Sequence, residues 1–270
     1  MGPMLTNLSS GFARAVLPLS AAPITTDTDG LTAGEVSIAV RDGEIPGYRA
    51  KPARAGRFPV VLVIQEIFGV HEHIRDVCRR LAKEGFFAVA PELYARQGDV
   101  SKMSDFQEII GKVVSQVPDA QVMADLDDTV AWAAKDESAD TSRLAITGFC
   151  WGGRITWLYA AHASALKAGA AWYGQLGQRD ANRPQSALDV ARELKAPVIG
   201  FYGGQDHGIP LAQVEQMREA LREAGKPSEI HVYPEAGHAF NADYRPSYNE
   251  AAAKDAWAKM LAWFRRCGVI

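Results

Sequence analysis

The sequence predicts an α/β protein whose mostly parallel sheet is covered by helices on both faces. Short apolar segments typical of buried strands alternate along the 270-residue chain with segments whose apolar residues recur at helical spacing. No linker, repeat or low-complexity tract interrupts this alternation, so we expect a single domain over residues 31–270. With 47% hydrophobic and 23% charged residues, the composition excludes disordered and fibrous proteins.

The first expected elements are a β-hairpin, a buried strand and a helix. The segments EVSIAV and EIPGYRA flank an Asp-Gly turn, which is typical of a hairpin. The next run, PVVLVIQE at 59–66, is continuously apolar, as parallel strands covered on both faces are. In HEHIRDVCRRLAKEG the apolar residues recur at helical spacing until Gly85, which ends the helix.

The remaining elements continue the alternation. In order they are strand FFAVAP, helices from about 101 to 136, strand RLAITGF, helix 151–163, strands AGAAWYG and PVIGFYGG, helix 211–224, strand EIHVYP and a last helix from about 249 to 266. Ligands of such sheets collect at the carboxyl ends of the strands. We therefore expect the functional residues in the loops that follow the strands.

Residues 1–30 are expected to precede the domain as an N-terminal extension. The stretch GFARAVLPLSAAPITTDTDG resembles an export signal, but its apolar part is short, is interrupted by Arg14 and follows no basic residue. We interpret the extension as a degraded export segment, or in the case of MGPM as a vector-derived remnant. No other stretch approaches the roughly 18 apolar residues of a membrane span.

The net charge and the cysteine content limit the kinds of partner that we expect for this protein. The net charge is -3, and scattered lysines and arginines leave no electrostatic footprint for nucleic acid. Three widely spaced cysteines form neither a disulfide framework nor a CxxC metal site and fit a reducing compartment. We expect a cytoplasmic protein that acts on a small molecule, with no cofactor, metal, nucleic acid or membrane partner. The sequence does not indicate the oligomeric state.

The segment GFCWGG places a cysteine at a strand-to-helix turn. It has the arrangement of the GxSxG nucleophile elbow, with Cys150 in place of serine. Gly148 and Gly152 leave space where the strand doubles back, and the N-terminus of the next helix favours a thiolate. A buried structural cysteine is the alternative, and it is the role expected of Cys78 and Cys267 on helix faces. The flanking glycines favour a nucleophile at Cys150.

Two later strand ends supply an acid and a base. Asp206 follows one strand in FYGGQDHGIP, and His238 follows the last strand in YPEAGHAF. The order nucleophile, acid, histidine is that of the α/β-hydrolase triad. Asp206 alone is equally compatible with a turn former, and His238 with a surface residue. Their occurrence together at successive strand ends favours a triad with Cys150.

The other polar clusters are interpreted as structural or exposed. The HEH segment at 71–73 has a spacing that does not place both rings on one helix face, so we expect a solvated helix start. The acidic run DLDD at 125–128 is expected to lie on a solvated helix surface. His162 and His231 are expected to be structural or exposed, and His207 to be a loop residue.

Five motifs, QEIFGV, PELYAR, GFCWGG, GGQDHGIP and GHAF, occur here in the order found in the dienelactone hydrolases, also called carboxymethylenebutenolidases. The chain resembles this family over residues 35–266. The resemblance implies an α/β-hydrolase fold, a triad of Cys150, Asp206 and His238, and opening of an enol-lactone through a thioester. It also implies that Glu66 contacts the resting cysteine and, once substrate displaces it, takes the thiol proton. The alternative for Glu66 is a strand-end carboxylate at the sheet edge.

Backbone and aromatic groups complete the expected site. Attack on a carbonyl creates an oxyanion that needs N–H donors in a nearly dry site. We expect these donors to be the backbone groups of Trp151, directly after the nucleophile, and of Ile67 in the QEIFG loop. Tyr173, at the end of AGAAWYG, is expected to contact the substrate.

The resemblance also implies two arginines that bind the substrate carboxylate. One matches Arg96 in PELYAR. The other position, four residues after the histidine, is Ala242 in this chain, and Arg245 is the nearest candidate to replace it. This departure leaves two further hypotheses open. One is a general carboxylesterase or thioesterase of the same fold acting on less charged esters, and the other is a non-catalytic binding protein.

Overall fold

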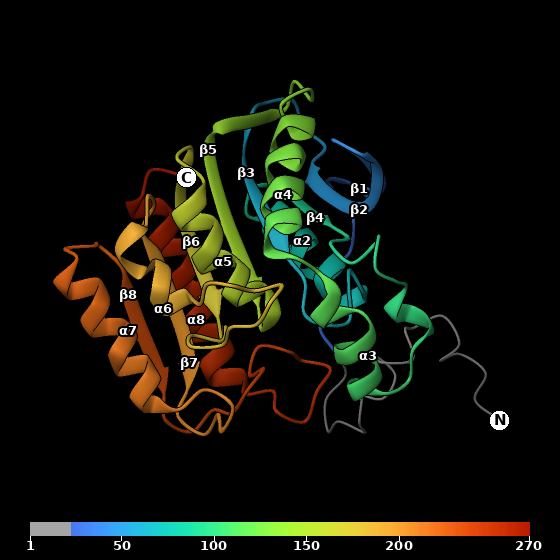
Figure 1. Ribbon diagram of the computed structural model, residues 1–270. Coiled ribbons are helices and arrows are strands. Elements are labelled where there is room, and N and C mark those ends of the chain that lie inside the picture. Colours follow the sequence, from blue (N-terminus) through green and yellow to red (C-terminus); the bar gives the residue numbers. More distant parts are fainter. Residues whose placement is uncertain (1–22) are drawn as a thin grey trace.

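A computed structural model describes residues 23–270, which form one eight-stranded sheet (Figure 1). The strands are β1 (Leu31–Val40), β2 (Gly43–Pro52), β3 (Phe58–Ile64), β4 (Phe87–Pro91), β5 (Ala139–Phe149), β6 (Leu166–Trp172), β7 (Val198–Gly203) and β8 (Glu229–Tyr233). Their spatial order is β1-β2-β4-β3-β5-β6-β7-β8. Strand β2 runs antiparallel to β1 and β4, and the other neighbours are parallel. The expected mostly parallel sheet is confirmed.

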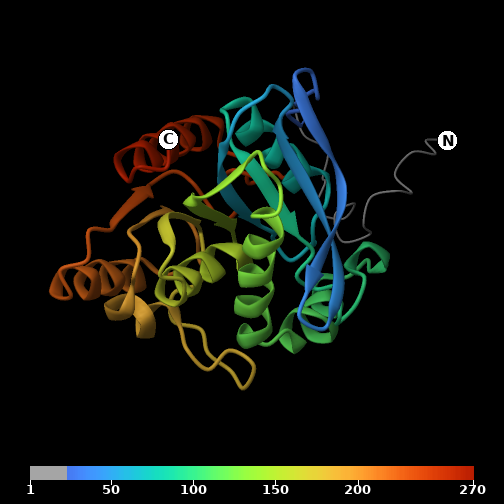
Figure 2. The ribbon, with the colours of Figure 1, turned by 90° about the horizontal axis from the view of Figure 1, so that it is seen from above.

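Helices cover both faces of this sheet. They are α2 (Glu72–Lys83), α3 (Phe106–Lys112), α4 (Asp119–Ala133), α5 (Trp151–His162), α6 (Ala187–Val190), α7 (Leu211–Glu223) and α8 (Glu250–Arg266). Figures 1 and 2 show α2 and α8 on one face and α4, α5 and α7 on the other. This layering is the one that the alternation of strands and helices predicts.

The helical region expected from about 101 to 136 is divided. Two short 3₁₀ turns, α3 and α4 occupy it, and α4 begins only after Pro118. Proline disfavours a helical conformation in the residue before it, and Val117 is accordingly extended. The break therefore has a local cause that is visible in the sequence.

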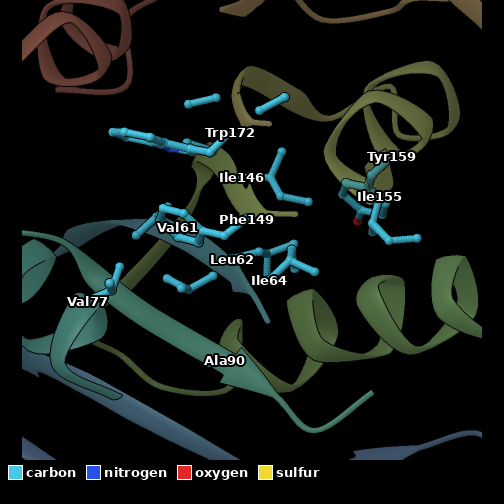
Figure 3. Close-up of a cluster of buried hydrophobic side chains, with 14 of the residues drawn as sticks. Val61, Leu62, Ile64, Val77, Ala90, Ile146, Phe149, Ile155, Tyr159 and Trp172 are labelled. Atoms are coloured by element: carbon cyan, nitrogen blue, oxygen red, sulfur yellow. The ribbon is translucent and has the colours of Figure 1, made fainter. Parts of the chain in front are cut away.

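The core is densest around the two central strands. Every residue of β3 is buried, as its continuously apolar sequence predicts. Figure 3 shows side chains of β3 and β5, among them Leu62 and Ile146, in one cluster with Ile155 of α5. Because β3 and β5 are held on both faces, the loops that follow them start from a rigid support.

The expectations for residues 1–22, an export segment or a vector-derived remnant, lie outside the described residues. Just downstream, the backbone N–H of Thr26 donates to Asp76 in α2, at 2.6 Å, and the N–H of Ile24 donates to Asp243, at 3.0 Å. These bonds tie the start of the described chain to α2 and to the loop after His238. Among residues 23–270 we find no helix with the length and apolar content needed to cross a membrane.

Candidate active site

Cys150 occupies the tight turn between β5 and α5. Its φ of 56° and ψ of -111° are unusual for a residue with a side chain, and such strain persists only where the surroundings fix it. The surroundings here are backbone contacts. A Cβ on Gly148 would lie 2.0 Å from the Gly152 carbonyl oxygen, and one on Gly152 would lie 2.5 Å from that of Ile64. The glycines are therefore required by the close approach of β5, α5 and β3.

The structure brings Cys150, Asp206 and His238 together. Nε2 of His238 lies 3.1 Å from Sγ of Cys150, and Nδ1 lies 2.6 Å from Oδ2 of Asp206. Asp206 is buried in the loop after β7, where its other oxygen accepts a hydrogen bond from the N–H of Gly208. His238 follows β8. Three loops at one edge of the sheet thus meet in a nucleophile, base and acid geometry.

His238 is strongly stabilised in its protonated form. Burial by itself lowers the pKa of His238, but the negative charge of Cys150 and the hydrogen bonds to Asp206 and Cys150 outweigh it and raise this pKa to about 10. The charge in question exists only when the Cys150 thiol is ionised. The geometry therefore suits an imidazolium next to a thiolate.

The two expected oxyanion donors belong to loops that leave the sheet at the same edge as the cysteine. Trp151 is the first residue of α5, so its N–H has no acceptor within the helix. Ile67 lies in the loop after β3, and β3 pairs in parallel with β5 so that Ile64 is opposite Gly148. The loops that carry Ile67 and Cys150 therefore begin at the same level.

Glu66 is held by a tyrosine instead of the cysteine. Its carboxylate is 1% exposed, and its Oε2 accepts a hydrogen bond of 2.5 Å from the hydroxyl of Tyr244. Within residues 23–270, the hydrogen bond to Sγ of Cys150 comes from His238, and none joins Cys150 to Glu66. The resting contact between Glu66 and Cys150 that the resemblance implies is not a hydrogen bond among the described residues, and it stays a prediction.

The interpretation of HEH as a solvated helix start is wrong. His71 and His73 are both buried and pack edge-on or tilted against the ring of Tyr244, at centroid distances of 5.2 and 5.1 Å. Nε2 of His71 lies 3.1 Å from the Tyr244 hydroxyl. The sequence analysis also missed Tyr244, because its only signal is a position six residues after His238.

Arg96 is engaged by two carboxylates. Its guanidinium forms a bidentate pair with Asp125, at 2.7 and 2.9 Å, and a second pair with Asp42. Asp125 is buried, so the interpretation of the whole DLDD run as solvated surface is wrong at this position. These pairs neutralise the charge that the expected carboxylate-binding role requires. Arg96 lines a cavity of about 830 Å³ with Phe68 and His71, but none of the triad residues lines it.

Arg245 directly follows Tyr244 in the loop after His238. Its guanidinium carbon is 5.9 Å from the centroid of the Phe68 ring. Its positive charge counteracts the burial that raises the pKa of Tyr173 and Tyr244. No salt bridge of Arg245 occurs among the described residues. Ala242, at the position of the family's second arginine, is fully buried.

Tyr173 forms one wall beside the histidine. Its ring is edge-on to that of His238 at a centroid distance of 5.3 Å, and its backbone has a φ of 40°. Burial, together with the charges of Glu66 and Cys150, raises the pKa of Tyr173 well above its ordinary value. The phenol is therefore neutral.

Within residues 23–270 no cluster of three or more histidine, cysteine or carboxylate side chains is arranged to hold a metal ion.

Comparison with known proteins identifies the family. The dienelactone hydrolase family model matches residues 45–268, which is most of the chain. The chain belongs to the dienelactone hydrolase family. A relative from Methylorubrum extorquens, provisionally named carboxymethylenebutenolidase, is 62% identical over 98% of this chain and 91% of its own length. The resemblance stated from the sequence is thus confirmed, and membership makes this protein a lactone or ester hydrolase.

Other known proteins are similar to this chain in sequence, in structure or in both. A crystal structure of a provisionally named dienelactone hydrolase from Klebsiella pneumoniae is 57% identical, with a TM-score of 0.85 over 87% of this chain and 99% of the other. A Bradyrhizobium protein, provisionally named 2-oxo-3-(5-oxofuran-2-ylidene)propanoate lactonase, is 32% identical over 81% of this chain and 88% of its own. The acylaminoacyl peptidase of Pyrococcus horikoshii, at 17% identity and a TM-score of 0.70 over 89% of this chain and 42% of its own, shares the fold.

Proposed function

We propose that this member of the dienelactone hydrolase family opens small lactones and activated esters with Cys150 as its nucleophile. The observation that carries the proposal is the contact of 3.1 Å between Sγ of Cys150 and Nε2 of His238, at a strained elbow that faces the other strand-end loops. A nucleophile, its base and an orienting acid in this order are the requirements of covalent acyl transfer. The intact set of three argues against a non-catalytic binding protein.

The first half of the reaction forms a thioester. The thiolate of Cys150 attacks the carbonyl carbon, and the N–H groups of Trp151 and Ile67 stabilise the resulting oxyanion. The oxyanion collapses and expels the ring oxygen of the lactone, or the alcohol of an ester. The imidazolium of His238 gives its proton to this oxygen. An enolate needs little help from a proton donor, so enol-lactones are favoured over ordinary alkyl esters.

The second half regenerates the enzyme. Neutral His238 takes a proton from water while the water oxygen attacks the thioester carbon, and Asp206 holds the ring in the required tautomer. The second oxyanion expels the Cys150 thiolate, which restores its pair with the imidazolium. One water is consumed, and a carboxylic acid and an enol or alcohol are released.

The charged residues near the site bear on the substrate class. Arg245 supports a substrate with a carboxylate, and the Bradyrhizobium relative is named for a lactone with a propanoate group. The alternative, a carboxylesterase or thioesterase for less charged substrates, is favoured by Ala242 and by the neutralisation of Arg96. We place an anionic enol-lactone first, since the charge of Arg245 acts on Tyr173 and no salt bridge neutralises it among the described residues.

A trapping experiment tests the proposal. Enzyme mixed with an enol-lactone and quenched in acid should show, by intact-protein mass spectrometry, an adduct on the peptide that contains Cys150. Cys150→Ala should lose the adduct and several orders of magnitude of activity. Cys150→Ser should keep only a trace, because a hydroxyl is a far weaker acid than a thiol. Retained turnover in Cys150→Ala would remove Cys150 from the mechanism.

A further inference from the structure

We propose that Gln65 is a positioning residue for the oxyanion site, because its side chain sets the orientation of the peptide group that supplies the Ile67 N–H. The inference rests on the proposed function, in which the N–H groups of Ile67 and Trp151 stabilise the oxyanion. It concerns a side-chain amide to which that mechanism assigns no step. Gln65 directly follows β3 and is fully buried.

The two ends of the Gln65 amide have different partners. Its Oε1 accepts a hydrogen bond of 2.9 Å from the backbone N–H of Leu93, in the loop after β4. Only the oxygen of a side-chain amide can accept such a bond, so the NH2 group is left to donate, and Nε2 lies 3.4 Å from the carbonyl oxygen of Glu66. Both contacts are buried, where an unpaired amide group is costly, so they favour one orientation of the side chain.

The Glu66 carbonyl belongs to the same peptide group as the Ile67 N–H. The described residues contain no cis peptide bond, so the C=O and the N–H of this planar group point in opposite directions. A donor that fixes the carbonyl on one side therefore fixes the direction of the N–H on the other side. An antiparallel bridge between Glu66 and Gly69 closes the same turn and restricts it further.

The loop after β4 contacts both segments that carry the expected oxyanion donors. Beyond the turn, the N–H of Val70 donates to Oε2 of Glu92 at 2.8 Å. The ring of Tyr94, two residues after Glu92, is edge-on to the indole of Trp151 at a centroid distance of 4.9 Å. The bond from this loop to Gln65 therefore couples the positions of the two donors.

The test compares a reaction that needs the oxyanion site with one that does not. An aldehyde, here phenylacetaldehyde, adds reversibly to a cysteine thiolate, and the oxygen of the resulting hemithioacetal takes the place of the oxyanion. Alkylation by iodoacetamide displaces iodide from a saturated carbon and forms no oxyanion. We expect Gln65→Met to lower kcat for a lactone by about tenfold or more with little change in KM, and to raise the inhibition constant of the aldehyde by a similar factor. Alkylation of Cys150 should keep its wild-type rate.

A second variant covers the case in which Gln65→Met does not fold. Gln65→Asn keeps an amide but is one methylene too short to reach both partners, so kcat and aldehyde inhibition should change in the same direction. The matched control is Gln121→Met in α4. The Gln121 amide is paired with that of Gln97 at 3.0 Å and makes no hydrogen bond to the loop after β3 among the described residues. This control should equal the wild type in every measurement.

Wild-type kcat and aldehyde inhibition in a folded Gln65 variant would overturn the proposal. An equal slowing of iodoacetamide alkylation would also overturn it, because the substitution would then have damaged the nucleophile instead of the oxyanion site. Failure of the proposed function would be seen separately, as hydrolysis retained by Cys150→Ala.

Discussion

Ile64 in β3 lies directly opposite Gly148 in β5. The carbonyl oxygen of Ile64 also lies so close to Gly152, at the start of α5, that a side chain on Gly152 would collide with it. This register brings the strand end that leads to Glu66 level with the elbow that carries Cys150. It also leaves no space for a side chain between them. The catalytic geometry is therefore inseparable from the packing of three backbones.

The requirement for glycine at position 152 can be tested by adding one methyl group. A Cβ at Gly152 would lie 2.5 Å from the Ile64 oxygen and 2.6 Å from that of Gln65, and neither is a flexible atom. We expect Gly152→Ala to destabilise the fold by about 1–3 kcal/mol and to abolish most activity, because Cys150 must shift. Urea unfolding and kcat/KM measure the two effects.

Gly111→Ala is the control for that substitution. Gly111 lies in α3, and a Cβ there meets no atom within 4 Å. Alanine should stabilise the helix by about 0.5–1 kcal/mol and leave hydrolysis unchanged. Equal behaviour of the two variants would show that the close contact at Gly152 is not the cause.

The charge of Cys150 should be visible in the titration of His238. Because the thiolate is the first of the influences that raise the pKa of His238 to about 10, Cys150→Ala should return it toward the ordinary 6.5. Histidine ring signals in NMR spectra recorded from pH 5 to 11 measure both variants. A His238 that titrates identically in the two would contradict the ion pair.

The same pKa predicts two different pH profiles. In the free enzyme the pKa of His238 is raised to about 10, so the loss of its imidazolium should lower kcat/KM as the pH rises toward 10, well above the ordinary histidine range of about 6 to 7. The thioester carries no negative charge, so His238 regains a lower pKa there and must be neutral to accept a proton from water. Where hydrolysis of the thioester limits turnover, kcat should fall as the pH drops through that ordinary range. Parallel profiles for both constants would contradict this separation.

Asp206 is expected to act on turnover through the orientation of His238. Its Oδ2 lies 2.6 Å from Nδ1, so Asp206→Asn removes the charge that supports the imidazolium and introduces an amide N–H that can donate to Nδ1 and select the wrong tautomer. We expect kcat to fall by about a hundredfold or more while KM changes little. Steady-state kinetics with one lactone decide this. A change confined to KM would assign Asp206 to substrate binding.

Arg245 and Arg96 are expected to have different roles, and Arg245 is expected to act on substrate preference. Arg245→Ala is expected to lower the ratio of kcat/KM for an anionic lactone to that for its methyl ester by about tenfold, which is the worth of one charge-assisted hydrogen bond. Arg218→Ala, in a surface pair on α7, should leave the ratio unchanged. An unchanged ratio in Arg245→Ala would favour the esterase alternative.

Arg96→Ala should instead act on stability. Asp125 is 1% exposed and would lose both bonds of its bidentate partner. Removing one member of a buried ion pair typically costs about 3–5 kcal/mol, so the melting temperature should drop. The substrate ratio should stay near that of the wild type. A collapse of the ratio with an unchanged melting temperature would restore Arg96 to the substrate-binding role.

The sequence by itself determined the features that depend on neighbouring residues. Apolar runs and helical spacing report which face of a segment is buried, so the alternation of strands and helices and the parallel sheet were predictable. The elbow was predictable because its glycines flank Cys150 within five residues. Asp206 and His238 were predictable because parallel strands end at one edge, which converts positions far apart in the chain into neighbours.

Only the tertiary structure decided which polar groups are buried together. Tyr244 and Glu66 are 178 residues apart, and nothing local distinguishes this tyrosine from a surface one. The burial of His71 depends on a loop that arrives from the far end of the chain, and the pairing of Arg96 with Asp42 depends on a hairpin turn. A charged or polar side chain is stable in the interior only with its partner, and the partner is set by the packing of distant segments. The periodicity of a single segment carries no information about it.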